Sequence, residues 1–216
     1  MNRVLLALAL VALLAAPGLA REFTPYGGPV PAPSPSRADI ELEYDGGVFV
    51  AYGTSPGWTD ETAVVFEAPA GGPFTVVDVR YYVHGTSSRP VHFWPVTSLW
   101  GPPYGTATVG PDFVPAYPSF PPADFTTVDV TGMGMTMNTG DFAAPGLPIY
   151  GDGDGIGLAY AYDDGNPGHS WCIWGGAWTD DTYGYGYDDG IRLGLDYGGS
   201  TPTAETSWGA VKGMFR

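Results

Sequence analysis

Residues 168–190, GHSWCIWGGAWTDDTYGYGYDDG, concentrate side chains that can bind a ligand. The segment holds three tryptophans, three tyrosines, four aspartates and the only cysteine of the chain, and it has no lysine or arginine. Indole and phenol rings offer flat apolar faces with a polar edge, and paired carboxylates are oxygen ligands of the kind that calcium prefers. The segment is therefore a candidate for a sugar-stacking surface, a calcium site or two packed strands.

A second aromatic group lies between Trp94 and Phe125, in a stretch rich in proline. Prolines at that density exclude a central strand, because each lacks the amide hydrogen that the sheet needs. We predict a long loop there, and long loops in compact domains often bind ligands. The candidate ligand-binding residues of the two regions are Trp94, Trp100, Tyr104, Tyr117, Trp174, Trp178, Tyr183 and Tyr185.

Aspartate pairs raise the possibility of a bound calcium ion. The run DGDGIGLAYAYD (152–163) has acids at several ligand positions of a helix-loop-helix calcium loop, but Ile156 and Leu158 occupy others, so that type of site is rejected. A sandwich-type calcium site formed by loops remains, and turn aspartates that bond their own backbone are the alternative. The candidate ligands are Asp152, Asp154, Asp163 and Asp164.

Catalytic motifs are absent from the sequence. The three histidines, His84, His92 and His169, show no zinc-binding spacing, and there is no G-x-S-x-G elbow. Ser170 and Cys172 lie one and three residues after His169. In a strand, residues at odd spacings point to opposite faces, which disfavours a catalytic pair with His169. We predict a non-catalytic protein and keep a secreted hydrolase as an alternative, since two aspartates could cleave a glycoside.

The chain begins MNRVLLALALVALLAAPGLA, with one basic residue, an apolar core, and Gly18 and Ala20 before a cleavage site. This pattern is typical of a secretory signal peptide over residues 1–20, and its apolar stretch is too short for a membrane span. Arg21 follows the cleavage site, so a lipid-modified cysteine is excluded there. We predict a secreted protein, extracellular or at the cell surface, without a transmembrane segment.

The composition is strongly acidic, with 23 acidic and 8 basic residues and a formal net charge of −15. Cleavage would remove Arg3 and no acid, which leaves −16. Such a chain repels phosphate instead of releasing its counterions, so nucleic acid is excluded as a partner. The single cysteine, Cys172, allows no internal disulfide, and we expect it to be a buried, inert thiol.

From Asp39 onward the chain consists of short β-branched and aromatic runs separated by turn residues, without a long segment of helical period. We predict a single-domain, all-β antiparallel β-sandwich over 39–198, after a Pro-rich linker over 21–38. A change of phase at Val76 and Val77 predicts a β-bulge. The predicted strands are Ile40–Tyr44, Val48–Tyr52, Ala63–Glu67, Phe74–Val83, Val91–Val96, Phe125–Val130, Gly155–Tyr162, Ser170–Trp174 and Ile191–Tyr197.

A Gly-Gly pair predicts a turn after Ser170–Trp174. We expect a return strand that starts at Trp178 and includes Tyr183, Tyr185 and Tyr187, which alternate with glycine. The alternation would gather the tyrosine rings on one face of the hairpin. An exposed strip of rings could stack on sugars, whereas a covered one would be part of the core.

Several short motifs occur in a characteristic order. They are Tyr44-Asp45-Gly46-Gly47, VFEAPAGGPFTVVDVRYYVHG, VHFWPV, FTTVDVTGMGMTMNTGDFAAPG, HSWCIWGGAWTDD and GIRLGLDY, and they span about residues 40–197. This order resembles the jelly-roll-like β-sandwich modules of secreted multidomain bacterial proteins. The resemblance implies a non-catalytic module, of a kind that accompanies peptidases, glycosidases or adhesive repeats.

Residues 199–216 are predicted to be a flexible linker and a short tail. Trp208, Val211 and Phe215 recur at helical spacing, and Lys212 and Arg216 make this end of the chain basic. The tail is similar to short motifs that end many exported proteins of environmental bacteria and look like sorting or anchoring tags. The similarity implies anchoring of the protein at the cell surface through the tail.

Taken together, these features predict a secreted extracellular or cell-surface binding module for carbohydrate or a protein ligand. The alternative from a different class is a structural surface protein that assembles through its strand edges. Calcium is the one cofactor that the sequence suggests.

Overall fold

The computed structural model describes residues 22–25, 36–46, 48–54, 59–150, 156–162, 169–174, 176–180 and 187–198. Within these ranges every regular element is a strand, apart from one turn of 3₁₀ helix, η1 (Thr131–Met133). All strand pairs are antiparallel, which confirms the predicted all-β class. None of the described helices is long and apolar enough to cross a membrane.

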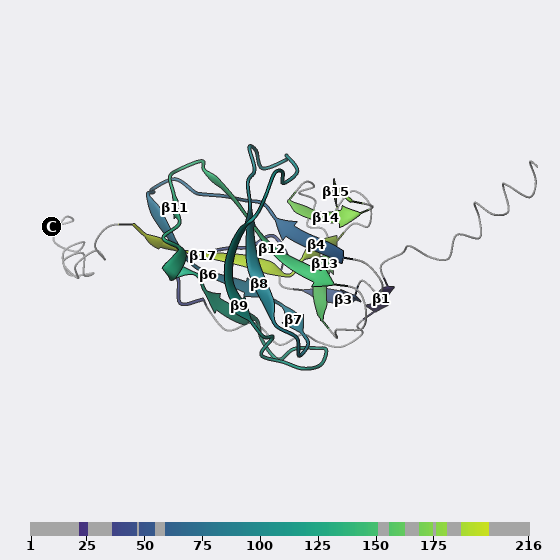
Figure 1. The fold of residues 1–216 in the computed structure, drawn as a ribbon. Helices are drawn as coiled ribbons and strands as arrows, with labels where there is room; N and C mark the ends of the chain where they lie inside the picture. Colours follow the sequence, from purple (N-terminus) through teal and green to yellow (C-terminus); the bar gives the residue numbers. More distant parts are fainter. Residues whose placement is uncertain are drawn as a thin grey trace, which may run out of the picture.

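The described strands form three sheets (Figure 1). The first sheet has the order β1 (Glu22–Pro25), β3 (Phe49–Thr54), β13 (Gly157–Tyr162) and β16 (Tyr187–Asp189), with β7 (Val83–His84) also paired to β13. The second has the order β10 (Thr126–Asp129), β6 (Phe74–Tyr81), β17 (Ile191–Tyr197) and β2 (Ile40–Leu42), with β11 (Thr136–Met137) also paired to β6. The third has the order β15 (Ala177–Asp180), β14 (Ser170–Trp174), β4 (Thr59–Val64), β12 (Phe142–Tyr150), β8 (Arg89–Trp94) and β9 (Thr108–Phe113), with β5 (Phe66–Glu67) also paired to β12.

The main core lies between the second and third sheets. Each strand sends alternate apolar residues inward, as a half-buried strand does. The hydroxyl of Tyr81 on β6 donates to the carbonyl oxygen of Gly146 on β12 at 2.9 Å, and its ring stacks on Phe113 of β9 at 5.0 Å. These contacts join the two sheets face to face in a sandwich-like arrangement. Residues that fill the space between them include Val76, Val79, Leu193, Leu195, Val91, Phe93, Leu147 and Ile149.

The predicted bulge in β6 is confirmed. Asp78 lies opposite Gly194, whereas Val76 lies opposite Leu195, so Val77 is the extra residue on β6. The bulge lets both Val76 and Val79 face the core although they are three residues apart. Cys172 is buried, as predicted.

Two proline-containing strands correct the sequence analysis. The stretch from Trp94 to Phe125 is not loop throughout, because β9 lies within it; β9 is an edge strand, which tolerates Pro111. The unpredicted β12 is a central strand that contains Pro145 and Pro148. In the register of the sheet, Pro145 lies opposite a residue of β8 only and Pro148 opposite a residue of β4 only. Each proline therefore has a paired strand on one side only. The missing amide hydrogen is tolerated where no strand pairs on the other side.

The predicted hairpin is partly wrong. The turn after β14 exists, with Gly176 at φ 83°, but the return strand is β15, Ala177–Asp180. Tyr187 lies in β16, which pairs with β13 in the first sheet. Tyr183 and Tyr185 are outside the described residues.

The ends of the chain remain predictions for the most part. The interval assigned to a linker, 21–38, contains β1, which pairs with β3. The signal peptide, 1–20, and the tail, 199–216, lie outside the described residues.

Candidate functional site

The outer face of the third sheet, which points away from the main core, gathers aromatic and polar side chains. Gly146 on β12 lies opposite Ala63 on β4 and opposite His92 on β8. Since residues in register and residues two apart along a strand share one face, the strand register defines a common surface. The ligand-capable side chains on this surface belong to Glu61, His92, Trp94, Trp171 and Trp178.

Glu61 is the polar centre of this face. Trp94 donates from Nε1 to Glu61 Oε1 at 2.6 Å, and His92 Nδ1 lies 2.8 Å from the same oxygen. An ionised carboxylate only accepts hydrogen bonds, so the ionised form of Glu61 places a proton on His92 Nδ1. Glu61 is only 7% exposed. Two ring nitrogens from β8, which is separated from β4 by β12, therefore fix the position of a nearly buried carboxylate.

Gly146 makes room for this arrangement. A Cβ atom at Gly146 would lie 2.9 Å from Glu61 Oε1, 3.0 Å from the carbonyl oxygen of Thr62 and 3.2 Å from Trp94 Cδ1. The strand between β4 and β8 thus has no side chain at the point where the carboxylate and the indole meet. A larger residue there would push them apart.

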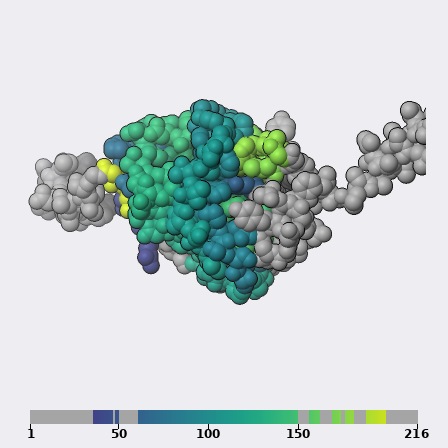
Figure 2. All heavy atoms as spheres, viewed as in Figure 1, coloured from purple at the N-terminus to yellow at the C-terminus, as the bar shows by residue number. Residues whose placement is uncertain are grey.

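Trp94 and Trp178 form an aromatic pair on this face. Their ring centroids are 5.1 Å apart at an interplanar angle of 81°, an edge-to-face contact. Both side chains are half-buried and pack against a base formed by Val65, Ala144 and Trp171. In Figure 2 the light-green atoms of β14 and β15 lie at the surface beside the teal atoms from the middle of the chain. The pair is therefore supported from below and reachable from solvent.

The segment that follows β8 folds over one end of this face as a closed loop. The amide of Tyr104 donates to the carbonyl oxygen of Pro95 at 3.1 Å, and Gly101 donates to Ser98 at 3.1 Å. Val96 and Leu99 pack against the base beneath Trp94 and Trp178. We refer to residues 95–104 as the platform loop, because it presents two exposed aromatic residues, Trp100 and Tyr104.

The structure brings together some of the candidate ligand-binding residues and not others. Trp94 and Trp178 touch, and Trp100 and Tyr104 share the platform loop. Tyr117 lies beyond the opposite end of the β8–β9 pair, where its carbonyl oxygen accepts from Gly85. For Trp174 the structure describes the backbone, which lies opposite Ala177. Tyr183, Tyr185, Asp152, Asp154, Asp163 and Asp164 are outside the described residues.

Sequence reasoning missed Glu61 and His92 as members of the site. Alternation in VHFWPV would have placed His92 and Trp94 on one face, because they are two residues apart in a strand. No comparable signal links Glu61 to Trp94, since that contact depends on two strands pairing with β12. No group of three or more His, Cys, Asp or Glu side chains in the described ranges is arranged to hold a metal ion.

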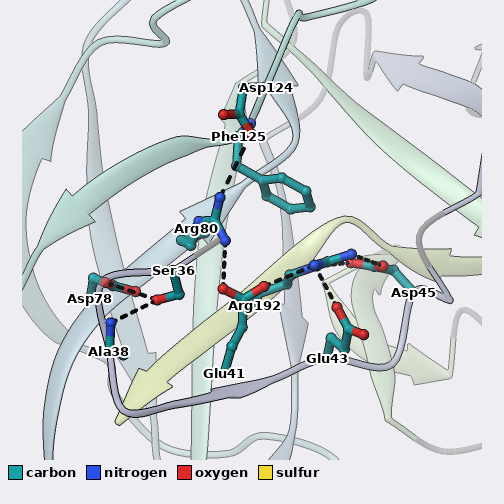
Figure 3. A network of polar contacts seen from close by, with 10 residues as sticks. All are labelled: Ser36, Ala38, Glu41, Glu43, Asp45, Asp78, Arg80, Asp124, Phe125 and Arg192. Atoms are coloured by element: carbon teal, nitrogen blue, oxygen red, sulfur yellow. Dashed lines mark hydrogen bonds and ion pairs between the residues drawn. The ribbon is translucent and has the colours of Figure 1, made fainter. Parts of the chain in front are cut away.

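A second polar cluster lies on the outer face of the second sheet, around Arg192 (Figure 3). Arg192 donates from Nε and Nη2 to the two carboxylate oxygens of Asp45 at 2.9 and 2.7 Å, and from Nη1 to Glu41 at 2.8 Å. Glu43 is a further ion-pair partner. Burial alone would lower the pKa of Arg192, but these carboxylates raise it above its usual value. The guanidinium is therefore fully engaged by the protein.

Arg80, which lies opposite Arg192 in the sheet, completes this cluster. It donates to Glu41 Oε2 at 2.5 Å and lies 3.6 Å from Asp124 Oδ1. The Phe125 ring lies 5.0 Å from the Arg80 guanidinium carbon and 4.5 Å from that of Arg192. Both arginines are nearly buried, so the cluster serves to hold strands together and is not a candidate ligand site.

Comparisons with known proteins identify the fold. No protein-family model and no curated protein matches the chain. It is similar to the crystal structure of the cysteine protease and lectin-like domains of Cwp84, a surface layer associated protein of Clostridium difficile, with a TM-score of 0.57, 15% identity, and coverage of 76% of this chain and 37% of that chain. A clostridial Cwp84 variant after propeptide cleavage gives a TM-score of 0.59, 15% identity and coverage of 76% and 41%. At this identity the likeness is one of fold, and the chain spans about two fifths of the chains that it matches.

Proposed function

We propose that this protein is a secreted, non-catalytic binding module that recognises carbohydrate at the cell surface or outside the cell. The single observation that carries the proposal is the outer face of the third sheet, where the half-buried Trp94–Trp178 pair adjoins the fixed carboxylate of Glu61. An apolar surface with a few positioned polar groups is the usual composition of a small-molecule site.

The chemistry of this face suits a sugar ring. One side of a pyranose is a flat array of C–H groups that can pack on an indole, and its hydroxyls need oriented acceptors and donors. The Glu61 carboxylate supplies hydrogen-bond acceptors. His92, whose Nδ1 lies against Glu61, supplies its other ring nitrogen, Nε2, as a further polar group. The edge-to-face geometry holds Trp94 and Trp178 in place, so little side-chain freedom is lost when a ligand binds.

The structural comparison supports the same class of function. We infer that the part of Cwp84 that matches is its lectin-like domain, because the described residues of this chain form strands and only one short 3₁₀ turn. A lectin-like domain of a surface-layer associated protein accords with secretion through residues 1–20 and with anchoring through residues 199–216, both of which we propose from the sequence.

Assembly through strand edges is less well supported. One of the two edge strands of the third sheet, β9, carries Pro111, which lacks an amide hydrogen, and the exposed Asp112. Both features oppose pairing with another strand.

Affinity electrophoresis of the mature protein in gels that contain soluble polysaccharides tests the proposal. The panel should include neutral glucans, mannans and galactans together with anionic polygalacturonate. We expect retardation by at least one neutral polysaccharide and a loss of about tenfold or more in affinity for Trp178→Ala, which removes half of the aromatic pair. Trp178→Phe retains a ring and should lose less.

Tyr117→Ala is the matched control, because it removes an aromatic residue of the same 94–125 stretch at the far end of β8 and β9. Its retardation should equal that of the wild type. Absence of retardation by every polysaccharide would contradict carbohydrate recognition, and release of reducing ends during incubation would show a hydrolase instead.

A further inference from the structure

Trp100 stands at the outer end of a continuous stack of aromatic rings. Its ring centroid lies 5.3 Å from that of His169 at 27°, His169 lies 3.8 Å from Tyr44 at 16°, and Tyr44 lies 5.2 Å from Phe66 at 12°. Phe66 is completely buried in the main core, and His169 is nearly buried. The stack therefore connects the core of the sandwich to the surface.

The stack leaves the far side of Trp100 open to solvent. Only one face of the indole lies against His169, and 56% of the residue is exposed. Tyr104, in the same loop, is 50% exposed. An indole face that is open to solvent and supported from behind offers a flat apolar surface on which a ligand can pack.

The platform loop holds Trp100 in a fixed position. Backbone hydrogen bonds close it between Pro95 and Tyr104 and again just after Trp100, and two successive prolines, 102 and 103, restrict its backbone. The adjacent Leu99 is packed against the same base that supports Trp94 and Trp178. A ring that is already immobile loses little conformational entropy on binding, which favours affinity.

We propose that the exposed face of Trp100, together with Tyr104 of the same loop, is a second sugar-stacking subsite, and that the ligand is a neutral glycan chain long enough to contact both this subsite and the Trp94–Trp178 pair. The inference rests on the proposed carbohydrate function and specifies its ligand class. Trp100 and the Trp94–Trp178 pair are two aromatic contact points, and they are linked through Leu99, the neighbour of Trp100, which packs against the base of the pair. Two such points favour a chain over a single sugar. The net charge of −15 disfavours anionic glycans, because like charges repel.

Chain length is the variable that tests the second subsite. Isothermal titration should be carried out with the monosaccharide and with oligosaccharides of increasing length derived from the neutral polysaccharide that gives the strongest retardation. We expect wild-type affinity to rise by about tenfold or more with length, and Trp100→Ala to lose this rise while keeping the affinity for the shortest ligand that binds.

Tyr197→Ala is the matched control, since Tyr197 is another exposed aromatic residue, 47% exposed, at the end of β17 in the second sheet. It should bind like the wild type at every length. If Trp100→Ala retains the full dependence on length while Trp178→Ala loses binding, the second subsite is refuted and the proposed function stands. If the wild type binds no oligosaccharide, both fail, and tighter binding of polygalacturonate than of the neutral chains would refute the neutral ligand class.

Discussion

Asp78 shows how one buried carboxyl can act against stability. The residue is 5% exposed. Among the described residues its Oδ1 has no hydrogen-bond partner, and its Oδ2 accepts a long hydrogen bond of 3.4 Å from Ser36 Oγ. A Cβ at Gly194 would lie 2.3 Å from Asp78 Oδ1, so the Asp78 side chain fits only because residue 194 has no side chain. Burial raises the pKa of Asp78 above its usual value of 3.8, the positive charge of Arg80 lowers it, and the negative charge of Glu41 raises it again.

The first prediction follows from the sign of that shift. A carboxyl with a raised pKa in the folded state binds protons more readily folded than unfolded, so its ionisation destabilises the fold above that pKa and ceases to do so as the pH falls through it. We expect Asp78→Asn to have a higher melting temperature than the wild type at pH 7, with the difference shrinking toward pH 4. Thermal unfolding followed by circular dichroism measures this.

Asp112→Asn is the control, because it removes the same charge from an exposed position on β9. Its melting temperature should follow that of the wild type at each pH. A melting temperature of Asp78→Asn that is lower than the wild type at pH 7 would mean that the charge of Asp78 is needed beside Arg80.

At the scale of elements, the short strand β2 depends on the polar cluster for its attachment. β2 has three residues, and Ile40 and Leu42 are only partly buried. Among the described strands it pairs with β17 alone. The acids along and just after this strand, Glu41, Glu43 and Asp45, all contact Arg192 (Figure 3). A buried Asp45 without its partner would be an uncompensated charge.

We therefore predict that Arg192→Met lowers the free energy of unfolding by about 3–5 kcal/mol, the usual effect of removing one partner of a buried ion pair. The double variant Arg192→Met with Asp45→Asn should regain part of that loss, because the buried negative charge of Asp45 is removed as well. Urea denaturation of the three proteins gives the values.

Arg37→Met is the matched control, since Arg37 is exposed and lies just before β2. It should change the free energy of unfolding by less than about 0.5 kcal/mol. A loss for Arg192→Met no larger than that of Arg37→Met would show that strand pairing alone holds β2 in place.

At the scale of the whole molecule, the protein has 23 acidic and 8 basic residues, and this excess of negative charge favours binding of cations. The calcium site proposed at Asp152, Asp154, Asp163 and Asp164 would use this excess. A ligand that binds only the folded state stabilises it. We predict that millimolar calcium raises the melting temperature and that EDTA reverses the rise.

Magnesium at the same concentration is the control for ionic strength, since it prefers a smaller octahedral site. Asp152→Asn with Asp154→Asn should remove the response to calcium. An equal response to both ions would indicate general screening of negative charge, and no response to either would favour turn aspartates.

The sequence by itself determined the β class, most of the strand positions, the bulge at Val77 and the buried state of Cys172. These features follow from alternation and turn residues within short windows, because the side chains of a strand point to its two faces in turn. The aromatic character of the candidate site was also readable, through Trp94, Trp100 and Trp178.

Only the tertiary structure decided which of these residues meet. The contact of Glu61 with Trp94 depends on β4 and β8 pairing with opposite sides of β12, a strand whose two prolines hid it from sequence analysis. The stack of Trp100 on His169 and Tyr44 joins three segments that are far apart along the chain. Register between strands and the approach of distant loops are set by packing of the whole sandwich, which no local pattern records.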